Sequence, residues 1–261
     1  MKHYNLLAIL VLLLFTMACE TAPEEVEARL LPENMSITLV QGSQTNKIIA
    51  DFYYIPDTDQ LDHITWSNHQ THYFEYDASN RISVVRVIRV DAKVQEERWF
   101  VYDGQEVERI DLVKRNLDYT YLEPVDSVYT GYIELTYEGE NIIEESDYEI
   151  SAGGFREEYV RKVSYTYDER GNLVSSVETD PASGETRQRT MTYDDSKHPF
   201  HALYYYFEGE SFVNNMLTKS DADGFDYNYD LRLNDEQYPE TVYEKLGSSY
   251  TRIINYSYRY L

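Results

Sequence analysis

The chain has 261 residues and a formal net charge of −24, with 47 acidic against 23 basic residues. This acidic balance argues against nucleic-acid binding, which needs basic surface to displace counterions, and against docking onto anionic lipid headgroups. Hydrophobic residues make up 42% of the chain, which suffices for a core, and tyrosine dominates the aromatic residues, with 27 Tyr against 9 Phe and 2 Trp.

The first 18 residues have the parts of an export signal. Lys2 supplies a positive charge, and an unbroken apolar run follows from Leu6 to Phe15. A run of this length is typical of a signal peptide and is too short to span a bilayer, which takes about 20 apolar residues. We therefore expect residues 1–18 to be a signal peptide that is removed on export.

Cys19 directly follows this segment and is the only cysteine of the chain. The sequence TMAC resembles a lipobox, in which a small residue precedes the cleaved bond and the cysteine sulfur carries diacylglycerol. A lone cysteine in an exported chain calls for an explanation, and lipidation supplies one; ordinary cleavage after Ala18, leaving a free thiol, is the alternative. The sequence predicts that residues 19–34 consist of a lipid-modified Cys19 followed by an acidic tether. One all-β domain follows over residues 35–261.

A repeated unit dominates the predicted domain. Alternating aromatic residues lead into Tyr-Asp or Tyr-Glu, then a polar turn, then an apolar residue, as in YTYDERGNL at Tyr165–Leu173. The motif residues are Tyr76 and Asp77, Tyr102 and Asp103, Tyr137 and Glu138, Tyr167 and Asp168 with Gly171 and Asn172, and Tyr193 and Asp194. Each unit has the length of a β-hairpin with its connection, so we expect the tyrosine at a strand end and the acid in the turn.

Beside these turns, apolar and polar residues alternate with a period of two. Tyr159, Arg161, Val163, Tyr165 and Tyr167 share one predicted strand face, for example. Such alternation indicates half-buried antiparallel strands, with the aromatic face pointing inward. We expect an all-β antiparallel meander of about 12–16 strands, curled or closed into a barrel-like sheet, because an open edge invites pairing with other chains.

On these motifs the chain resembles a family of Gram-negative bacterial lipoproteins, a domain of unknown function with a porin-like fold, related to tyrosine-aspartate (YD) repeat proteins. The matching stretches are Tyr165–Val174, Tyr193–Phe200 and Tyr227–Val242. The resemblance implies a fold and an address in the cell envelope, but no activity, cofactor or catalytic residue. Because polar and charged residues occupy the second strand face, where a membrane barrel needs an apolar band, we expect the barrel to lie in water.

Two groups of histidines have spacings at which a helix could hold zinc: His69 and His72, with His63 nearby, and His198 and His201. On strands, side chains three residues apart point to opposite faces, so these pairs should not converge. The sequence therefore predicts no metal site at the histidines.

Asp221, Asp223 and Asp226 resemble part of a calcium loop, but the distal Glu of an EF-hand is missing. A hairpin turn at Asp223-Gly224 explains the same residues. Adjacent carboxylates are frequent in so acidic a chain and face apart on strands, and no nucleophile elbow, P-loop or dinucleotide motif is present. We therefore predict no catalytic residue and no cofactor.

The aromatic surplus is the remaining candidate for function. Exposed tyrosine and tryptophan side chains, Trp66 and Trp99 among them, can stack on sugars or hold a partner, although packing inside the barrel would explain the surplus as well. The expected function is that of an outer-membrane lipoprotein, a binding or structural module whose partner is a glycan or an envelope protein. The alternative is an enzyme acting on envelope glycans, with carboxylates converging from separate strands beside a cleft.

Overall fold

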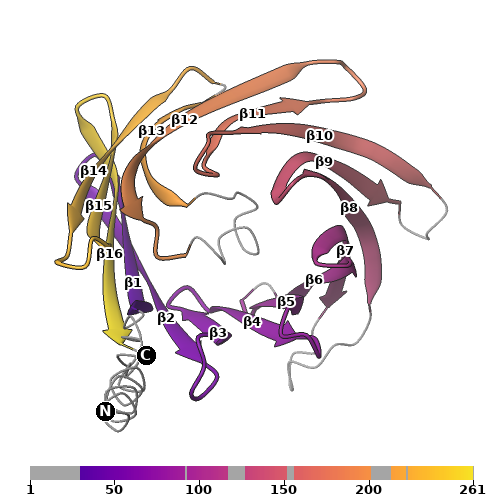
Figure 1. Cartoon of the computed structure of the whole chain (residues 1–261), viewed down its shortest axis with the longest axis horizontal. Coiled ribbons are helices and arrows are strands. Elements are labelled where there is room, and N and C mark those ends of the chain that lie inside the picture. Colours follow the sequence, from indigo (N-terminus) through magenta and orange to yellow (C-terminus); the bar gives the residue numbers. More distant parts are fainter. Residues whose placement is uncertain are drawn as a thin grey trace, which may run out of the picture. The chain divides into compact units, whose positions relative to one another are not determined.

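In the computed structural model, sixteen antiparallel strands form a closed barrel (Figure 1). The structure describes residues 30–91, 93–116, 127–151, 156–200, 213–221 and 223–260, so the predicted signal and Cys19 lie outside the described residues. Within these ranges, no helix has the length and apolar character needed to cross a membrane.

The strands follow one another around the barrel in chain order, and β1 pairs with β16 to close it. The predicted all-β meander is thereby confirmed, in its closed form. The strands are β1 (Leu30–Gln41), β2 (Gln44–Tyr54), β3 (Leu61–Trp66), β4 (Gln70–Tyr76), β5 (Ile82–Arg89), β6 (Val94–Asp103), β7 (Glu106–Asn116), β8 (Val128–Glu138), β9 (Asn141–Ile150), β10 (Glu157–Tyr167), β11 (Leu173–Thr179), β12 (Thr186–Lys197), β13 (Asn214–Ser220), β14 (Asp226–Leu233), β15 (Pro239–Leu246) and β16 (Ser249–Tyr260).

The first strand begins earlier than the sequence predicts. Residues 30–34, expected to belong to the tether because of their acid and proline, are the first residues of β1. Leu30 is buried, and the carbonyl of Pro32 accepts a hydrogen bond of 2.8 Å from the hydroxyl of Tyr54 on β2. The tertiary partner thus extends the strand beyond the point where composition suggests a tether.

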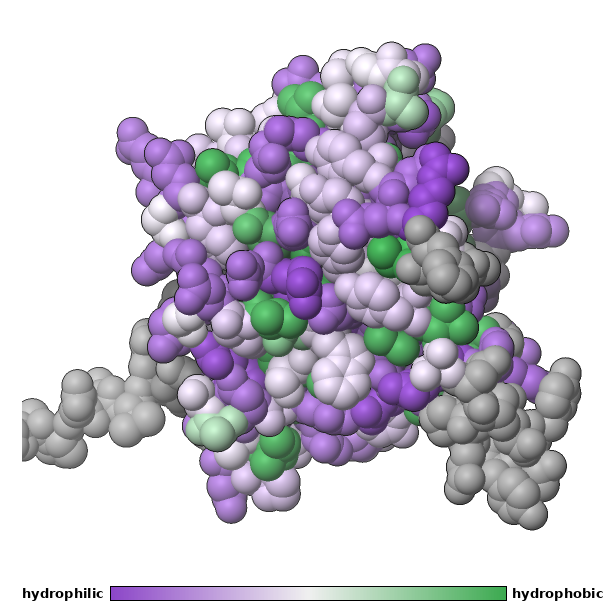
Figure 2. Space-filling model, turned by 90° about the vertical axis from the view of Figure 1, so that its right-hand side faces the viewer, coloured by the Kyte–Doolittle hydropathy of each residue, from purple (hydrophilic) through white to green (hydrophobic). Residues whose placement is uncertain are grey.

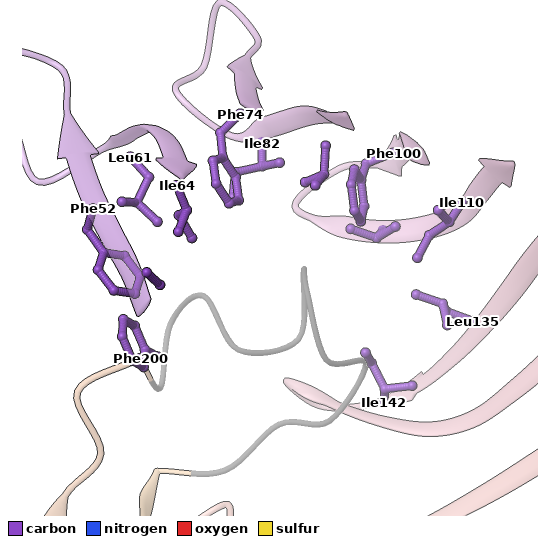
Figure 3. Packing of buried hydrophobic residues seen from close by; sticks show 13 residues of the cluster. Phe52, Leu61, Ile64, Phe74, Ile82, Phe100, Ile110, Leu135, Ile142 and Phe200 are labelled. Atoms are coloured by element: carbon purple, nitrogen blue, oxygen red, sulfur yellow. The ribbon is translucent and has the colours of Figure 1, made fainter. Parts of the chain in front are cut away.

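The inner wall carries the hydrophobic core (Figure 3). Phe52, Phe74 and Phe100 point inward from β2, β4 and β6, and Phe200, from the connection between β12 and β13, stacks on Phe52 at a ring-centroid distance of 5.1 Å. The other labelled members of this cluster are Leu61, Ile64, Ile82, Ile110, Leu135 and Ile142. Because strand side chains alternate, these residues assign an inner and an outer face to every strand that pairs with theirs.

One strand departs from the predicted alternation. Between Tyr159 and Arg161 the register of β10 on β9 shifts by one residue, which is a β-bulge. Arg161, Val163 and Tyr165 keep the inner face, but Tyr159 pairs with outward Tyr148 and lies on the outer wall. The prediction that Tyr159 shares a face with Tyr165 is therefore wrong, because an extra residue reverses the alternation at that point.

Charged side chains are present on the outer wall of the barrel. Glu144 on β9 pairs with Lys162 on β10 at 2.6 Å, and both face outward. Lys47, Asp51, Glu75, Arg109 and Glu134 face outward as well. On the side of the barrel that carries β7 and β8, Figure 2 shows pale side chains of intermediate hydropathy among purple hydrophilic ones, with the green hydrophobic ones in small groups.

Candidate functional site on the outer wall

Three of the five motif tyrosines, Tyr76, Tyr102 and Tyr193, close hairpins. The hydroxyl of each donates to a main-chain carbonyl at the start of the preceding strand. These bonds are Tyr76 to Leu61 (3.0 Å), Tyr102 to Ile82 (2.7 Å) and Tyr193 to Leu173 (2.7 Å), and Tyr54 and Tyr258 make the same bond to Pro32 and Pro239. The repeat thus holds together the open end of each of these hairpins.

The motif acids occupy two kinds of position. Asp77 and Asp168 lie in turns, where one carboxylate oxygen accepts two backbone N–H groups; for Asp168 these are Arg170 and Asn172, both at 2.9 Å. Asp103 and Glu138 are instead the last residues of β6 and β8, beside two-residue turns whose glycines, Gly104 and Gly139, have positive φ. The glycine replaces the acid as the turn-forming residue in those copies. Tyr137 and Tyr167 lie against buried hydrophobic clusters on the inner wall.

The Tyr167 copy also anchors the connection between β12 and β13. The buried side chain of Asn172 accepts N–H bonds from Val213 (3.0 Å) and Asn214 (2.8 Å) and donates to Asn214 and Asp168. Asp194, in the Tyr193 copy, lies within β12 rather than in a turn and accepts the N–H of Asn215 at 3.1 Å. Gly171, with φ of 84°, makes the turn that presents Asn172.

Among the residues that the structure describes, His63, His69 and His72 do not converge. His63 faces outward between two tyrosines, His72 faces inward, and His69 sits in the turn between β3 and β4 with φ of 65° rather than on a strand. His198 precedes Phe200, and His201 lies outside the described residues. In the described part of the chain, no three His, Cys, Asp or Glu side chains are grouped to hold a metal.

The aspartates that resemble part of a calcium loop lie at the turn between β13 and β14. The N–H of Asp221 donates to the carbonyl of Phe225 at 2.7 Å, and the N–H of Gly224, which has φ of 79°, donates back to Asp221 at 3.0 Å. Asp226 begins β14, where its carboxylate accepts the hydroxyl of Ser220 at 2.6 Å. Asp223 and Gly224 lie in the turn that the sequence suggests for them.

A pair of carboxylates lies on the inner wall. Glu145 is buried on β9, two residues from Asp147, and both bind the guanidinium of Arg161. Burial and the neighbouring Asp147 carboxylate raise the pKa of Glu145 to about 7. The two acids come from one strand and share one arginine, which is an ion-pair arrangement; the alternative in the sequence analysis is a pair that converges from separate strands.

The outer wall carries an aromatic belt, made of Tyr53, His63, Tyr73, Trp99, Tyr129, Tyr132, Tyr148 and Tyr159. Two of its parts are ring stacks that cross the strands. In the first stack, on β2–β4, the ring of His63 lies 4.3 Å from that of Tyr53 and 5.7 Å from that of Tyr73. In the second stack, on β8–β10, the ring of Tyr148 lies 4.6 Å from that of Tyr132 and 5.2 Å from that of Tyr159.

Trp99 lies between the two stacks, and a buried carboxylate holds its indole ring in place. Its indole N–H donates to the Glu97 carboxylate at 2.9 Å. Glu97 is only 3% exposed and also accepts hydrogen bonds from Arg86, Arg115 and Gln95. Burial opposes ionisation of Glu97, but the bonds from Arg115, Trp99, Arg86 and Gln95 outweigh it and hold its pKa below the usual range.

Tyr129 and Tyr132 of the belt are also held by charged side chains. The hydroxyl of Tyr129 donates to Asp111 at 2.8 Å, and the guanidinium of Arg109, itself paired with Asp111, lies over the ring of Tyr132. Yet the rings stay open to solvent, with exposed fractions of 46% for Tyr53 and 41% for Trp99 and Tyr129. Fixed, exposed aromatic rings can stack on the apolar faces of sugars.

Comparison with solved structures finds the same fold. A porin-like protein from Bacteroides vulgatus matches with a TM-score of 0.55 at 13% identity, over 88% of this chain and 99% of that one. A porin-like protein from Bacteroides uniformis matches with a TM-score of 0.50 at 10% identity, over 87% and 98%. The Tc holotoxin pore of Photorhabdus luminescens, 20% identical, matches over 81% of this chain and 10% of that one at a TM-score of 0.32, too low to carry an argument.

No protein-family model matches the chain, and no curated protein matches it either. The similarity to the two porin-like proteins therefore concerns the fold alone.

Sequence reasoning found only one member of the belt. Trp99 was a candidate and is exposed, whereas Trp66, the other candidate, faces inward and packs against the core. The missed signal was the pairing of aromatic residues in sequence, as in Phe52-Tyr53 and Trp99-Phe100. Since neighbours on a strand face apart, such pairs place one ring in the core and one on the outer wall.

Proposed function

We propose that the protein is a cell-envelope lipoprotein, anchored through Cys19 and displayed at the outer membrane, whose barrel binds a glycan on the outer aromatic belt. The observation that carries the proposal is the set of exposed aromatic rings, of which Trp99 and Tyr129 are held in place by hydrogen bonds to Glu97 and Asp111. Rings that are already ordered lose little conformational entropy on binding, so their contact area translates into affinity.

The anchor and the location rest on the sequence. The apolar run of residues 6–15 followed by TMAC supports export and lipidation, and the similarity of fold to two bacterial porin-like proteins is consistent with an envelope setting. A barrel that stands in water, held by its lipid, accounts for the outward Glu144–Lys162 pair and the other charges of the outer wall. A charged side chain facing lipid at mid-bilayer costs about 2–4 kcal/mol, so these charges argue against an intramembrane barrel.

The belt favours a glycan over a protein partner. A protein-binding patch has an apolar centre, whereas here aromatic rings alternate with charged side chains: Arg109 pairs with Asp111, and Glu97 accepts the indole N–H of Trp99. Sugars match this mixture because each offers one apolar face and a rim of hydroxyls.

The test is retention of glycans by the soluble barrel, residues 20–261. Native gels cast with neutral polysaccharides (xylan, mannan or dextran) should retard the protein, and Trp99→Ala should abolish the retardation. Tyr250→Ala, which removes an equally exposed tyrosine on β16 outside the belt, is the matched control and should keep it.

Two results would overturn the proposal: no retardation by any glycan at micromolar protein, or retardation that Trp99→Ala leaves intact. Capture of an envelope protein in place of any glycan would reassign the belt to protein binding.

A further inference from the structure

The two stacks of the belt are connected by strand register. One row of directly paired outward residues runs from Tyr53 through His63 and Tyr73 to Arg86 and Glu97, across β2–β6. A second row starts at Val84 on β5 and runs through Trp99, Asp111, Tyr132 and Tyr148 to Tyr159, across β5–β10. The rows overlap on β6, where Glu97 and Trp99 are adjacent on the outer face and hydrogen-bonded.

The belt is therefore continuous from β2 to β10, at right angles to the strands. Strands in a sheet lie about 4.8 Å apart, so nine strands span about 38 Å around the wall. A single sugar cannot contact both stacks, and only an extended chain of several sugars reaches from one to the other.

The open ring surfaces lie where a chain needs them. Tyr53 and Tyr73, at the two ends of the first stack, and Tyr159, at one end of the second, are exposed, whereas Tyr132, the other end ring of the second stack, lies beneath Arg109. Trp99, 41% exposed, offers a further ring between the stacks. Open ring surfaces thus recur along the belt with polar groups between them.

The charge of the belt favours an uncharged ligand. Arg86 bonds to Glu75 and Glu97, and Arg109 bonds to Asp111, so the guanidinium groups are already paired with carboxylates. The chain as a whole carries a net charge of −24, which repels polyanions.

We infer that the two stacks and Trp99 are subsites of one elongated site, and that its ligand is a neutral polysaccharide strand lying across the barrel strands from β2 to β10. This inference rests on the proposed function and adds the form, direction and charge of the ligand.

The experiment is a length series. Xylo-, manno- and malto-oligosaccharides, from monosaccharide to octasaccharide, are titrated by calorimetry against the full-length chain in detergent, with oligogalacturonate as the anionic counterpart. Linked subsites multiply affinity, so the affinity of the bound series should rise about 100-fold or more from disaccharide to octasaccharide. The oligogalacturonate should bind more weakly than the neutral chain of equal length.

Substitution at the two ends of the belt tests the linkage. Tyr53→Ala and Tyr159→Ala should each weaken octasaccharide binding about tenfold and weaken disaccharide binding far less, because a short chain occupies one subsite only and the remaining subsites stay available. Tyr53→Phe, which keeps the ring, should bind as the unmodified protein does, and Tyr250→Ala is the control outside the belt. Circular dichroism and thermal unfolding verify that each variant is folded.

The possible results distinguish a failure of the elongated site from a failure of glycan binding itself. Affinity that levels off at the disaccharide, or octasaccharide binding that neither end substitution weakens, overturns the elongated site while glycan binding stands. Tighter binding of oligogalacturonate overturns the preference for neutral chains. Absence of binding by every oligosaccharide overturns both the inference and the proposed function.

Discussion

The hydroxyl of Tyr102, near the end of β6, donates a hydrogen bond of 2.7 Å to the carbonyl of Ile82, the first residue of β5. Tyr193 makes the equivalent bond to Leu173 on the opposite side of the meander. The repeated tyrosine therefore fastens a hairpin at the end that its own turn leaves open, which gives the repeat a role in stability.

Tyr102→Phe and Tyr193→Phe should each lower the free energy of unfolding by about 1–3 kcal/mol, because each leaves a shielded carbonyl without its donor. Urea denaturation measures the loss. Tyr53→Phe removes an exposed hydroxyl of the same residue type and should change stability by less than about 0.5 kcal/mol. Equal losses in all three variants would contradict the hairpin-closing role.

Asn172→Ala should destabilise the barrel by about 3 kcal/mol or more. The substitution removes the acceptor for the N–H groups of Val213 and Asn214 and the donor to Asp168, all at a fully buried site. Asn228→Ala, at an exposed position on β14, is the control. Limited proteolysis should cut the Asn172→Ala variant first near the connection between β12 and β13, and a normal digestion pattern would refute the anchoring role.

The buried Glu145 should make stability fall as pH rises. Burial and Asp147 raise its pKa to about 7 in the folded state, above its ordinary value of 4.5, so the folded protein holds this proton more tightly than the unfolded chain. The stabilisation is present below about pH 4.5 and is lost as the pH rises through about 7. The urea midpoint of the unmodified protein should therefore fall between about pH 5 and pH 8, and in Glu145→Gln this dependence on pH should be weaker. Glu149→Gln, which changes an exposed acid of the same strand, should keep the dependence of the unmodified protein.

Gly131→Ala should cost about 3 kcal/mol or prevent folding. A Cβ atom at Gly131 would lie 2.1 Å from the carbonyl oxygen of Tyr148, on the strand that carries the centre of the second stack. Gly139→Ala is the matched control, since no atom lies within 4 Å of its Cβ position and only the positive φ of 63° opposes it, at about 1 kcal/mol. Similar thermal unfolding of the two variants would show that β8 and β9 separate more easily than their backbone contact indicates.

Cys19 should carry lipid and become the first residue of the mature protein. Mass spectrometry of the membrane fraction should find diacylglycerol on its sulfur, and Cys19→Ala should move the protein to the soluble fraction. An unmodified Cys19, or an alanine variant that stays with the membrane, would refute the anchor.

Strand periodicity and turn chemistry carry most of the fold prediction. The turns after Tyr76-Asp77 and Tyr167-Asp168 can be predicted from nearby residues, because the aspartate accepts backbone N–H groups two and four residues ahead. The start of β1 could not be read in the same way, since Pro32 is held by Tyr54, a residue distant in sequence. The closure of the sheet likewise depends on strands at opposite ends of the chain.

The candidate site was the harder part to predict. Its stacks arise from register between strands, and Tyr53, His63 and Tyr73 become neighbours only once β2, β3 and β4 are aligned. The face of Tyr159 depends on a single bulge in β10, which no local pattern in the sequence signals. Alternation can therefore identify the strands, but cross-strand pairing decides which aromatic side chains meet.

The pairing of β1 with β16 implies an order of folding. Every other ladder joins strands adjacent in the chain, and such hairpins form in about 1–10 μs, whereas closing the ring requires the two ends of the domain to meet. The closing ladder should thus form last and set the folding rate. A circular permutant that links Tyr260 to Leu30 and opens the exposed turn at residues 180–185 would turn this slow step into a local hairpin and move the late step to β11 and β12.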